Sequence, residues 1–507
     1  MMENIINELT TNGQSVSIDQ IPKLSFEELH DEIEKCVAEP DGHCISYYAI
    51  QNEKGLTFIA CLANDESHSI RVISCEMKAG EKKKTLAISK NHFPFHVYER
   101  EISENFGVDF FWHPWPKPLR FPYNAVHGRE INEYPFYRIS SEELHEVGVG
   151  PIHAGVIEPG HFRFICNGEM VLHLEIQLGW QHRGVETLML QKATLLQKNI
   201  IAESIAGDTA IGHGLAFTQL IEGLGDIRIP KRVEIERSIA LELERIAIHT
   251  GDLSALCTDV AYQLGSSVFG ALRTPVINFT QSWCGNRFGK GLIRPGGSNY
   301  IFRENLRDNL NKMLDDFEVR FKAIADRTFN LDSVLGRFEK IGHITEKQVR
   351  MFGGVGMVAR MAGVRRDVRW SHPSSGYQYL DFDPVVLESG DVMARALLRK
   401  LEVEQSIAYI RDLLTIWEET KDQNIDSPPI NIKLKPNAFN LSMTEGWRGE
   451  ICHSAITDEK GEIVHYKVKD PSIHNWMGLA LALRNLEISD FPINNKSFDL
   501  SYCGHDL

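Results

Sequence analysis

The chain has 507 residues, enough for two or three domains that each bury a core of their own. Its composition, 43% hydrophobic and 24% charged, is ordinary for a soluble globular protein. The formal net charge of -15 is not offset by a basic block or stripe, which argues against a dedicated nucleic-acid binder. No run of about 18 apolar residues suggests a membrane span, and the nine cysteines are scattered without C-x-x-C spacing. We therefore expect a cytoplasmic protein with reduced thiols.

Residues 1–24 form a polar N-terminal segment, for which we expect loose order or a short helix. Residues 25–120 mix helical and strand-like spacing. They predict an α/β domain with a helix over 26–37 and strands over 44–50, 56–63 and 69–75. Residues 121–145 are aromatic, contain proline and show no clear period, so we interpret them as a linker.

Residues 146–507 have a different character and predict a second, mainly helical domain with small antiparallel sheets. Strand-like alternation at 156–176, with a turn at Asn167-Gly168, comes first. Apolar residues at helical spacing then predict long amphipathic helices over 233–257, 304–328 and 391–418. Strand-like alternation returns at 446–469, and a last helix is expected over 473–486. The predicted class is therefore α+β.

Two motifs are specific enough to indicate a family. The first is YEREISENFGV at 98–108, followed by His113-Pro114 and Pro118-Leu119-Arg120. It closely resembles the signature of the 30-kDa-type subunit of respiratory complex I and of its hydrogenase relatives. The second is GPIHAG at 150–155, followed by EPGHFRF at 158–164 and HRGVE at 182–186. It is similar to the start of the complex I 49-kDa subunit and of the large subunit of membrane-bound, energy-converting [NiFe] hydrogenases of the formate hydrogenlyase or hydrogenase-4 type.

The resemblance continues with gaps to the C-terminus and covers about residues 95–507. It implies a fusion of a 30-kDa-like domain (25–120) with a 49-kDa-like domain (146–507). It also implies an oxidoreductase subunit that is active only within a complex. The expected partners are an iron–sulfur small subunit that carries a [4Fe-4S] cluster and membrane-embedded complex I-like subunits. The chain itself is expected to bind no cofactor, and its sequence offers no NADH-binding motif.

The chain departs from the hydrogenase pattern at the metal. A nickel–iron centre requires thiolates, because soft, charge-donating sulfur holds such a redox-active site. The four positions where the resemblance places these cysteines hold side chains that supply no thiolate: Ala206, Thr209, Ser501 and Gly504. We therefore expect no metal. A weaker alternative site stays open, built from Asp208, His213, Cys503 and His505.

In the complex I branch, the cavity at the place of the nickel–iron centre binds a quinone headgroup through a histidine and a tyrosine. His153 matches the histidine and Asp259 the carboxylate that supports it, whereas the tyrosine position falls near Gly207. A neutral histidine paired with a carboxylate can donate to a carbonyl and pass on a proton. The alternative is that His153 only caps the tight turn after Gly150-Pro151.

Glu186 is the third catalytic candidate, because in metal-bearing relatives the matching glutamate relays protons. Its alternative is an ordinary buried ion pair with Arg245, Arg366 or Arg369. Several further charged or polar residues are candidates for the cavity or for a proton network around it: His182, Arg183, Asp208, His213, Arg245, Asp367 and Arg369.

The function implied by the resemblance is electron transfer to a quinone-like or unknown acceptor, coupled to proton or ion translocation and without a nickel–iron centre. The complex is expected to lie peripherally on the inner face of the cell membrane. A non-catalytic assembly scaffold that occupies the large-subunit slot is the main alternative. A true [NiFe] hydrogenase is the least favoured function, because the expected ligand positions lack thiolates.

Overall fold

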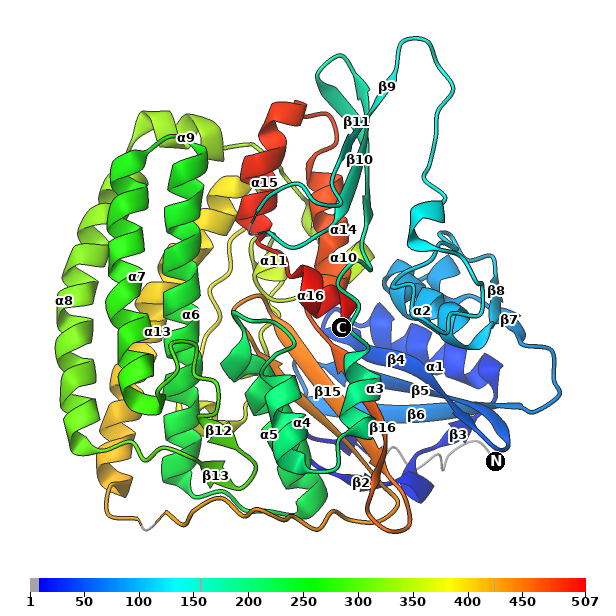
Figure 1. Cartoon of the computed structure of the whole chain (residues 1–507), viewed down its shortest axis with the longest axis horizontal. Helices are drawn as coiled ribbons and strands as arrows, with labels where there is room; N and C mark the ends of the chain where they lie inside the picture. The colour runs from blue at the N-terminus through cyan, green and yellow to red at the C-terminus, as the bar shows by residue number, and fades with distance from the viewer. Residues whose placement is uncertain (1–8, 156, 424) are drawn as a thin grey trace.

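A computed structural model describes residues 9–155, 157–423 and 425–507. An N-terminal five-stranded sheet, a bundle of long helices and a C-terminal four-stranded sheet surround the C-terminus of the chain (Figure 1). The predicted α+β class, with small antiparallel sheets, is confirmed. No helix in the described ranges combines the length and apolarity needed to cross a bilayer.

The N-terminal sheet has the order β1-β6-β5-β4, with β3 parallel to β6, and helices α1 and α2 lie beside it (Figure 1). The predicted helix begins at Ser25, whose side chain accepts a hydrogen bond from the Glu28 amide in a capping box. The elements are β1 (Leu9–Thr10), β3 (Lys23–Leu24), α1 (Phe26–Ala38), β4 (Gly42–Asn52), β5 (Gly55–Asn64), β6 (Ser69–Lys78), β7 (Lys84–Leu86), α2 (His96–Phe106) and β8 (Asp109–Phe111).

The N-terminal segment is more ordered than its composition indicates. Strands β1 and β3 both pair with β6, and β2 (Val16–Ser17) pairs with β14 (Ala438–Glu445) of the C-terminal sheet. The segment therefore links the two large sheets. Two-residue strands are held by backbone hydrogen bonds, which polar side chains do not prevent, so they leave no periodic signal in the sequence. Residues 1–8 lie outside the described ranges.

Residues 121–145 lead into β9 (His145–Val149), the edge strand of a three-stranded sheet with β10 (His161–Asn167) and β11 (Met170–Gln177). Strands β10 and β11 form the hairpin predicted around Asn167-Gly168. The preceding segment is anchored to this hairpin, because the Tyr134 hydroxyl and the Tyr137 amide both donate to the buried carboxylate of Glu175.

The helical bundle contains the three long predicted helices, α6 (Lys231–Asp259), α8 (Glu304–Thr328) and α13 (Val392–Thr420). Asp391 fixes the start of α13, because its carboxylate accepts a hydrogen bond from the Ala394 amide. Helix α7 (Gln263–Cys284) was not predicted. It contains Pro275, which argues against a helix interior, but its face with Phe269 and Val276 is fully buried in the bundle core.

The remaining helices and strands complete the second half of the chain. Strand β14 precedes the predicted strand region and has every residue buried, so it lacks the alternation that marks a half-exposed strand. These elements are α3 (Val185–Gln191), α4 (Leu195–Ala202), α5 (Ala210–Gly225), β12 (Ile293–Arg294), β13 (Gly297–Ser298), α9 (Asp332–Phe338), α10 (Glu346–Phe352), α11 (Met357–Arg360), α12 (Val368–Ser371), β14 (Ala438–Glu445), β15 (Glu450–Thr457), β16 (Ile463–Lys469), α14 (Ser472–Ala482), α15 (Phe491–Phe498) and α16 (Tyr502–Asp506).

Candidate functional site

The candidate site is the region around α16, where loops from distant parts of the sequence meet. The loop after Gly150 packs against the start of this helix. Glu158 accepts a hydrogen bond from the Cys503 amide at 3.2 Å, and Gly160 lies so close to Tyr502 that a Cβ there would be 2.5 Å from the ring. The His153 ring lies 6.2 Å from the Tyr502 ring, centre to centre. The fold therefore brings His153 next to the turn that holds Ser501.

Arg183 forms hydrogen bonds to both segments in which cysteines were expected, the one before Ala206 and the C-terminal turn. Its guanidinium donates to the carbonyl of Ile205 at 2.7 Å and to the carbonyl of Cys503 at 3.2 Å. His182 lies beside it, with Nδ1 2.8 Å from the Asp506 carbonyl oxygen. Both candidates thus bond to backbone carbonyls, and their role in this structure is to hold the C-terminal turn in place.

Asp208 and Thr209 form an ion-pair centre with Arg448. The guanidinium donates to both carboxylate oxygens of Asp208, at 2.7 and 2.8 Å, and to the Thr209 hydroxyl at 3.3 Å. It also donates to the Asp499 carbonyl at 2.5 Å, which links this segment to the C-terminal turn. Burial alone would raise the pKa of Asp208, but the Arg448 guanidinium lowers it.

Gly504 is tightly packed against Asp470. A Cβ added at Gly504 would lie 2.5 Å from the Asp470 carboxyl. That carboxyl is held by His213, whose Nε2 is 3.2 Å away, and by the Ser472 amide at 2.8 Å. The Ser501 hydroxyl accepts a hydrogen bond from the Gly504 amide and so caps α16.

These residues do not fit a nickel–iron centre. The four positions at which the resemblance places thiolates supply a methyl group, two hydroxyls and a glycine, and the Arg448 guanidinium donates to one of those hydroxyls, that of Thr209. In the described ranges no group of three or more His, Cys, Asp or Glu side chains is arranged to hold a metal. The alternative set around Asp208 and Cys503 is therefore not arranged as a metal site either.

His153 and Asp259 were predicted as a pair, and they have different neighbours. His153 Nδ1 lies 3.3 Å from the Pro151 carbonyl, as expected for a histidine that caps this turn. Its Nε2 is buried and makes no hydrogen bond to the described residues. Asp259 is exposed at the end of α6; partial desolvation by neighbouring residues raises its pKa, and Lys496 opposes that shift. No recorded interaction of the described residues joins the two, so the pair remains a prediction.

Glu186 pairs with Lys467, at 3.0 Å, and accepts a hydrogen bond from the Val468 amide at 3.0 Å. The three arginines that we weighed as partners lie elsewhere in the structure. Glu186 therefore forms an ion pair, as the alternative stated, but its partner is a lysine from β16 rather than an arginine.

Arg245, Asp367 and Arg369 belong to a fully buried charge cluster in the bundle. Arg245 lies 3.3 Å from Glu242 and 3.5 Å from Glu402, and Arg369 lies 2.7 Å from Asp367. Burial alone would raise the pKa of Glu402, but the surrounding guanidinium groups hold it well below its usual range. Each charge therefore has a partner, as a buried ionic network requires.

Tyr502 and Arg448 are the site residues that the sequence analysis missed. Both lie within recognised segments, but neither was assigned a role. Tyr502 is the residue between Ser501 and Cys503, and its ring faces His153 only because the loop after Gly150 folds back onto α16. Arg448 follows a strand by three residues, so its pairing with Asp208 depends on the tertiary structure.

Comparison with known proteins indicates the class of protein that this chain resembles. Residues 266–506 match the family described as respiratory-chain NADH dehydrogenase, 49 Kd subunit. The C-terminal half of the chain is therefore a complex I 49-kDa-type domain, as predicted. The fusion with a 30-kDa-type domain remains a prediction.

The homologues are subunits of membrane-bound hydrogenases and of NADH-quinone oxidoreductases. Formate hydrogenlyase subunit 5 of Escherichia coli (strain K12) is 26% identical over 91% of this chain and 82% of its own length. Hydrogenase-4 component G of the same organism is 26% identical over 73% of this chain, and the match spans only 63% of that protein. A chain of the membrane-bound sulfane sulfur reductase, an archaeal respiratory membrane complex, superposes with a TM-score of 0.66. That match covers 73% of this chain and all of the other at 22% identity, so it shows the fold alone.

Proposed function

We propose that this chain is a subunit of a membrane-associated, energy-converting oxidoreductase complex related to complex I, and that it works without a nickel–iron centre. The observation that carries the proposal is the structure around the four replaced cysteines. An arginine–aspartate pair lies at Asp208 and Thr209, and the Asp470 carboxyl leaves no room for a side chain at Gly504. These contacts favour a large-subunit fold adapted to a different task.

In this proposal the complex passes electrons to a quinone-like or still unknown acceptor and couples the transfer to proton or ion movement. A partner subunit supplies the [4Fe-4S] cluster. Membrane-embedded partners hold the chain at the cytoplasmic face of the membrane. Homology to subunits of such complexes supports the partner classes.

His153 is the group that we propose to meet the acceptor, and Tyr502 is its neighbour on α16. His153 Nε2 has no hydrogen bond to the described residues. Since Nδ1 donates to the Pro151 carbonyl, Nε2 of the neutral ring can accept a hydrogen bond from a quinol hydroxyl, and the protonated ring can donate one to a quinone carbonyl. A buried polar atom without a partner costs about 1–3 kcal/mol, which a ligand or water would recover. Tyr502 adds an aromatic ring, 6.2 Å from that of His153, and a hydroxyl group.

The test uses the complex purified through a tag on this chain. His153→Ala and Tyr502→Phe should each lower electron transfer to a soluble quinone while the subunit composition stays unchanged. His145→Ala is the matched control, because that histidine is exposed on the edge strand β9. Elemental analysis should find iron from the partner but no stoichiometric nickel. About one nickel per chain, or parent activity in both site variants, would contradict the proposal.

The assembly scaffold is the second candidate, and the buried charge cluster favours it. Arg245, Asp367 and Arg369 all have partners within the cluster, as in a network that only stabilises the fold. The same measurements separate the two functions, since a scaffold would support assembly but would show no electron transfer that depends on His153.

A further inference from the structure

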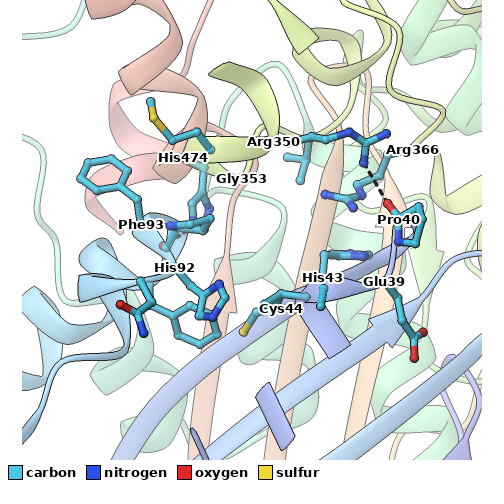
Figure 2. Close-up of a pocket in the computed structure, with 18 of the residues that line it drawn as sticks. Glu39, Pro40, His43, Cys44, His92, Phe93, Arg350, Gly353, Arg366 and His474 are labelled. Atoms are coloured by element: carbon cyan, nitrogen blue, oxygen red, sulfur yellow. Dashed lines mark hydrogen bonds between the residues drawn. The ribbon is translucent and has the colours of Figure 1, made fainter. Parts of the chain in front are cut away.

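A cavity separate from the candidate site lies at the contact between the N-terminal sheet domain and the helical domain. It has a volume of about 520 Å³ and is bounded by the loop between α1 and β4, the turn at Phe93–Phe95, and α10 with the glycine-rich segment that follows it (Figure 2). No residue of α16 or of the loop around His153 lines it. Its size falls within the range of sites that bind small molecules.

Two arginines form one wall of this cavity (Figure 2). Arg350 bonds through Nε to Glu346 at 2.8 Å and through Nη1 to the Pro40 carbonyl at 2.8 Å. Arg366 bonds through Nε to Asp65 at 3.2 Å, and only 9% of its side chain is exposed. Among the described residues, no hydrogen bond uses Nη2 of Arg350 or either terminal nitrogen of Arg366. Both guanidinium groups therefore keep donors for a ligand.

Buried histidines add polar atoms that also lack partners. His474 is 2% exposed, and its Nε2 lies 3.0 Å from the Pro94 carbonyl. Since that nitrogen must donate, Nδ1 is an acceptor, and it has no partner among the described residues. His43 is 7% exposed; its Nε2 bonds to Glu450 at 3.0 Å, and its Nδ1 is likewise without a hydrogen bond. Buried polar atoms are rarely left unpaired, so a bound molecule or water is expected here.

Apolar side chains also line the cavity. Phe93 and Phe95 come from the N-terminal domain, and Met351 comes from α10. Two glycines let these elements come together. A Cβ at Gly42 would overlap the Cys36 carbonyl oxygen at 1.8 Å, and one at Gly353, where φ is 75°, would lie 2.8 Å from Pro94. The cavity is thus set by the backbone rather than by mobile side chains.

We propose that this cavity binds a small organic oxyanion, a carboxylate or phosphate ester on an apolar body. The free nitrogens of Arg366 and Arg350 would hold the oxyanion, because a planar guanidinium matches carboxylate and phosphate geometry. The apolar body would lie against Phe93 and Met351. Three carboxylates lie nearby. Asp65 and Glu346 each pair with one of the arginines, and Glu39 accepts a hydrogen bond from the Asn64 side-chain amide.

The test is isothermal titration calorimetry on the full-length chain in its purified complex. The probes are benzoate, phenyl phosphate, inorganic phosphate and the neutral analogue benzyl alcohol. We expect at least one of the two aromatic anions to bind about tenfold or more tightly than benzyl alcohol, as a charge-assisted pair of hydrogen bonds implies. A preference between benzoate and phenyl phosphate identifies the oxyanion. Inorganic phosphate should bind more weakly because it lacks the apolar body.

Variants locate the site. Arg366→Gln should weaken binding of the aromatic anion by about tenfold or more, and Arg350→Gln should weaken it several-fold. Arg350 is 41% exposed, so its variant should fold even if loss of the buried Arg366 cation does not allow folding. Arg365→Gln is the control, since Arg365 is exposed, pairs with Asp383 and lies outside the cavity. The proposal is overturned if neither anion binds, if benzyl alcohol binds equally well, or if the Arg350 variant binds like the control.

Discussion

A side chain at Gly504 is the most direct perturbation of the structure around the replaced cysteines. A Cβ at this position would lie 2.5 Å from the Asp470 carboxyl, a distance that real Cβ contacts essentially never show. The carboxyl cannot easily move away, because it is 1% exposed and is held by His213 and the Ser472 amide. Gly504→Ala should therefore destabilise the protein, and Gly504→Cys should do so at least as much.

The expected cost is about 1–3 kcal/mol, the usual penalty for adding a methyl group to a well-packed interior. Equilibrium urea denaturation, followed by circular dichroism, measures it as a shift in midpoint at constant slope. Gly336→Ala is the matched control. A Cβ at Gly336, within α9, meets nothing within 4 Å, so that variant should be neutral or slightly more stable.

A double-mutant cycle assigns the cost to the contact. Asp470→Ala removes the obstructing carboxyl, so adding Gly504→Ala to it should cost less than in the parent, with a coupling of about 1–2 kcal/mol. If Gly504→Ala is as stable as the Gly336→Ala control, or if the two effects add without coupling, the steric argument is wrong. The incompatibility of this turn with a cysteine would then rest on chemistry alone.

Three further changes test other parts of the structure. Arg448→Gln should lower the free energy of unfolding by about 2 kcal/mol, less than for a fully buried pair because Asp208 is 36% exposed; Arg448→Lys should recover part of this in the same urea titration. Glu402→Gln should cost about 3–5 kcal/mol at neutral pH because it removes the buried carboxylate charge that faces Arg360, Arg245 and Arg369. Although burial opposes the shift, Arg360 holds the pKa of Glu402 well below its usual range. Its stabilisation is therefore present above about pH 4 and is lost as the pH falls, and the difference between parent and variant should shrink in acid. Gly353→Ala should lower the thermal midpoint because a positive φ and the 2.8 Å approach to a proline both disfavour a side chain; an unchanged midpoint would contradict this.

Local patterns determined the long elements of this protein. The helices α6, α8 and α13 have apolar residues at helical spacing over many turns, and that spacing survives whatever they pack against. The absence of cysteine at the four positions where the resemblance places thiolates is likewise read from the sequence, because the side chains there cannot donate sulfur in any fold: Ala206, Thr209, Ser501 and Gly504. These conclusions follow from the sequence alone.

Pairings between distant residues were decided only by the tertiary structure. The alternative interpretation of Glu186 paired it with an arginine, but it meets Lys467, because which cation reaches a carboxylate depends on how β16 packs against α3. The same holds for the short strand β2, whose backbone hydrogen bonds to β14 cross more than 400 residues of sequence and require no particular side chains. Tyr502 faces His153 because a loop folds back onto α16. Periodicity records which face of an element is buried, but it contains no information about the partner, and for that reason the site emerged only from the fold.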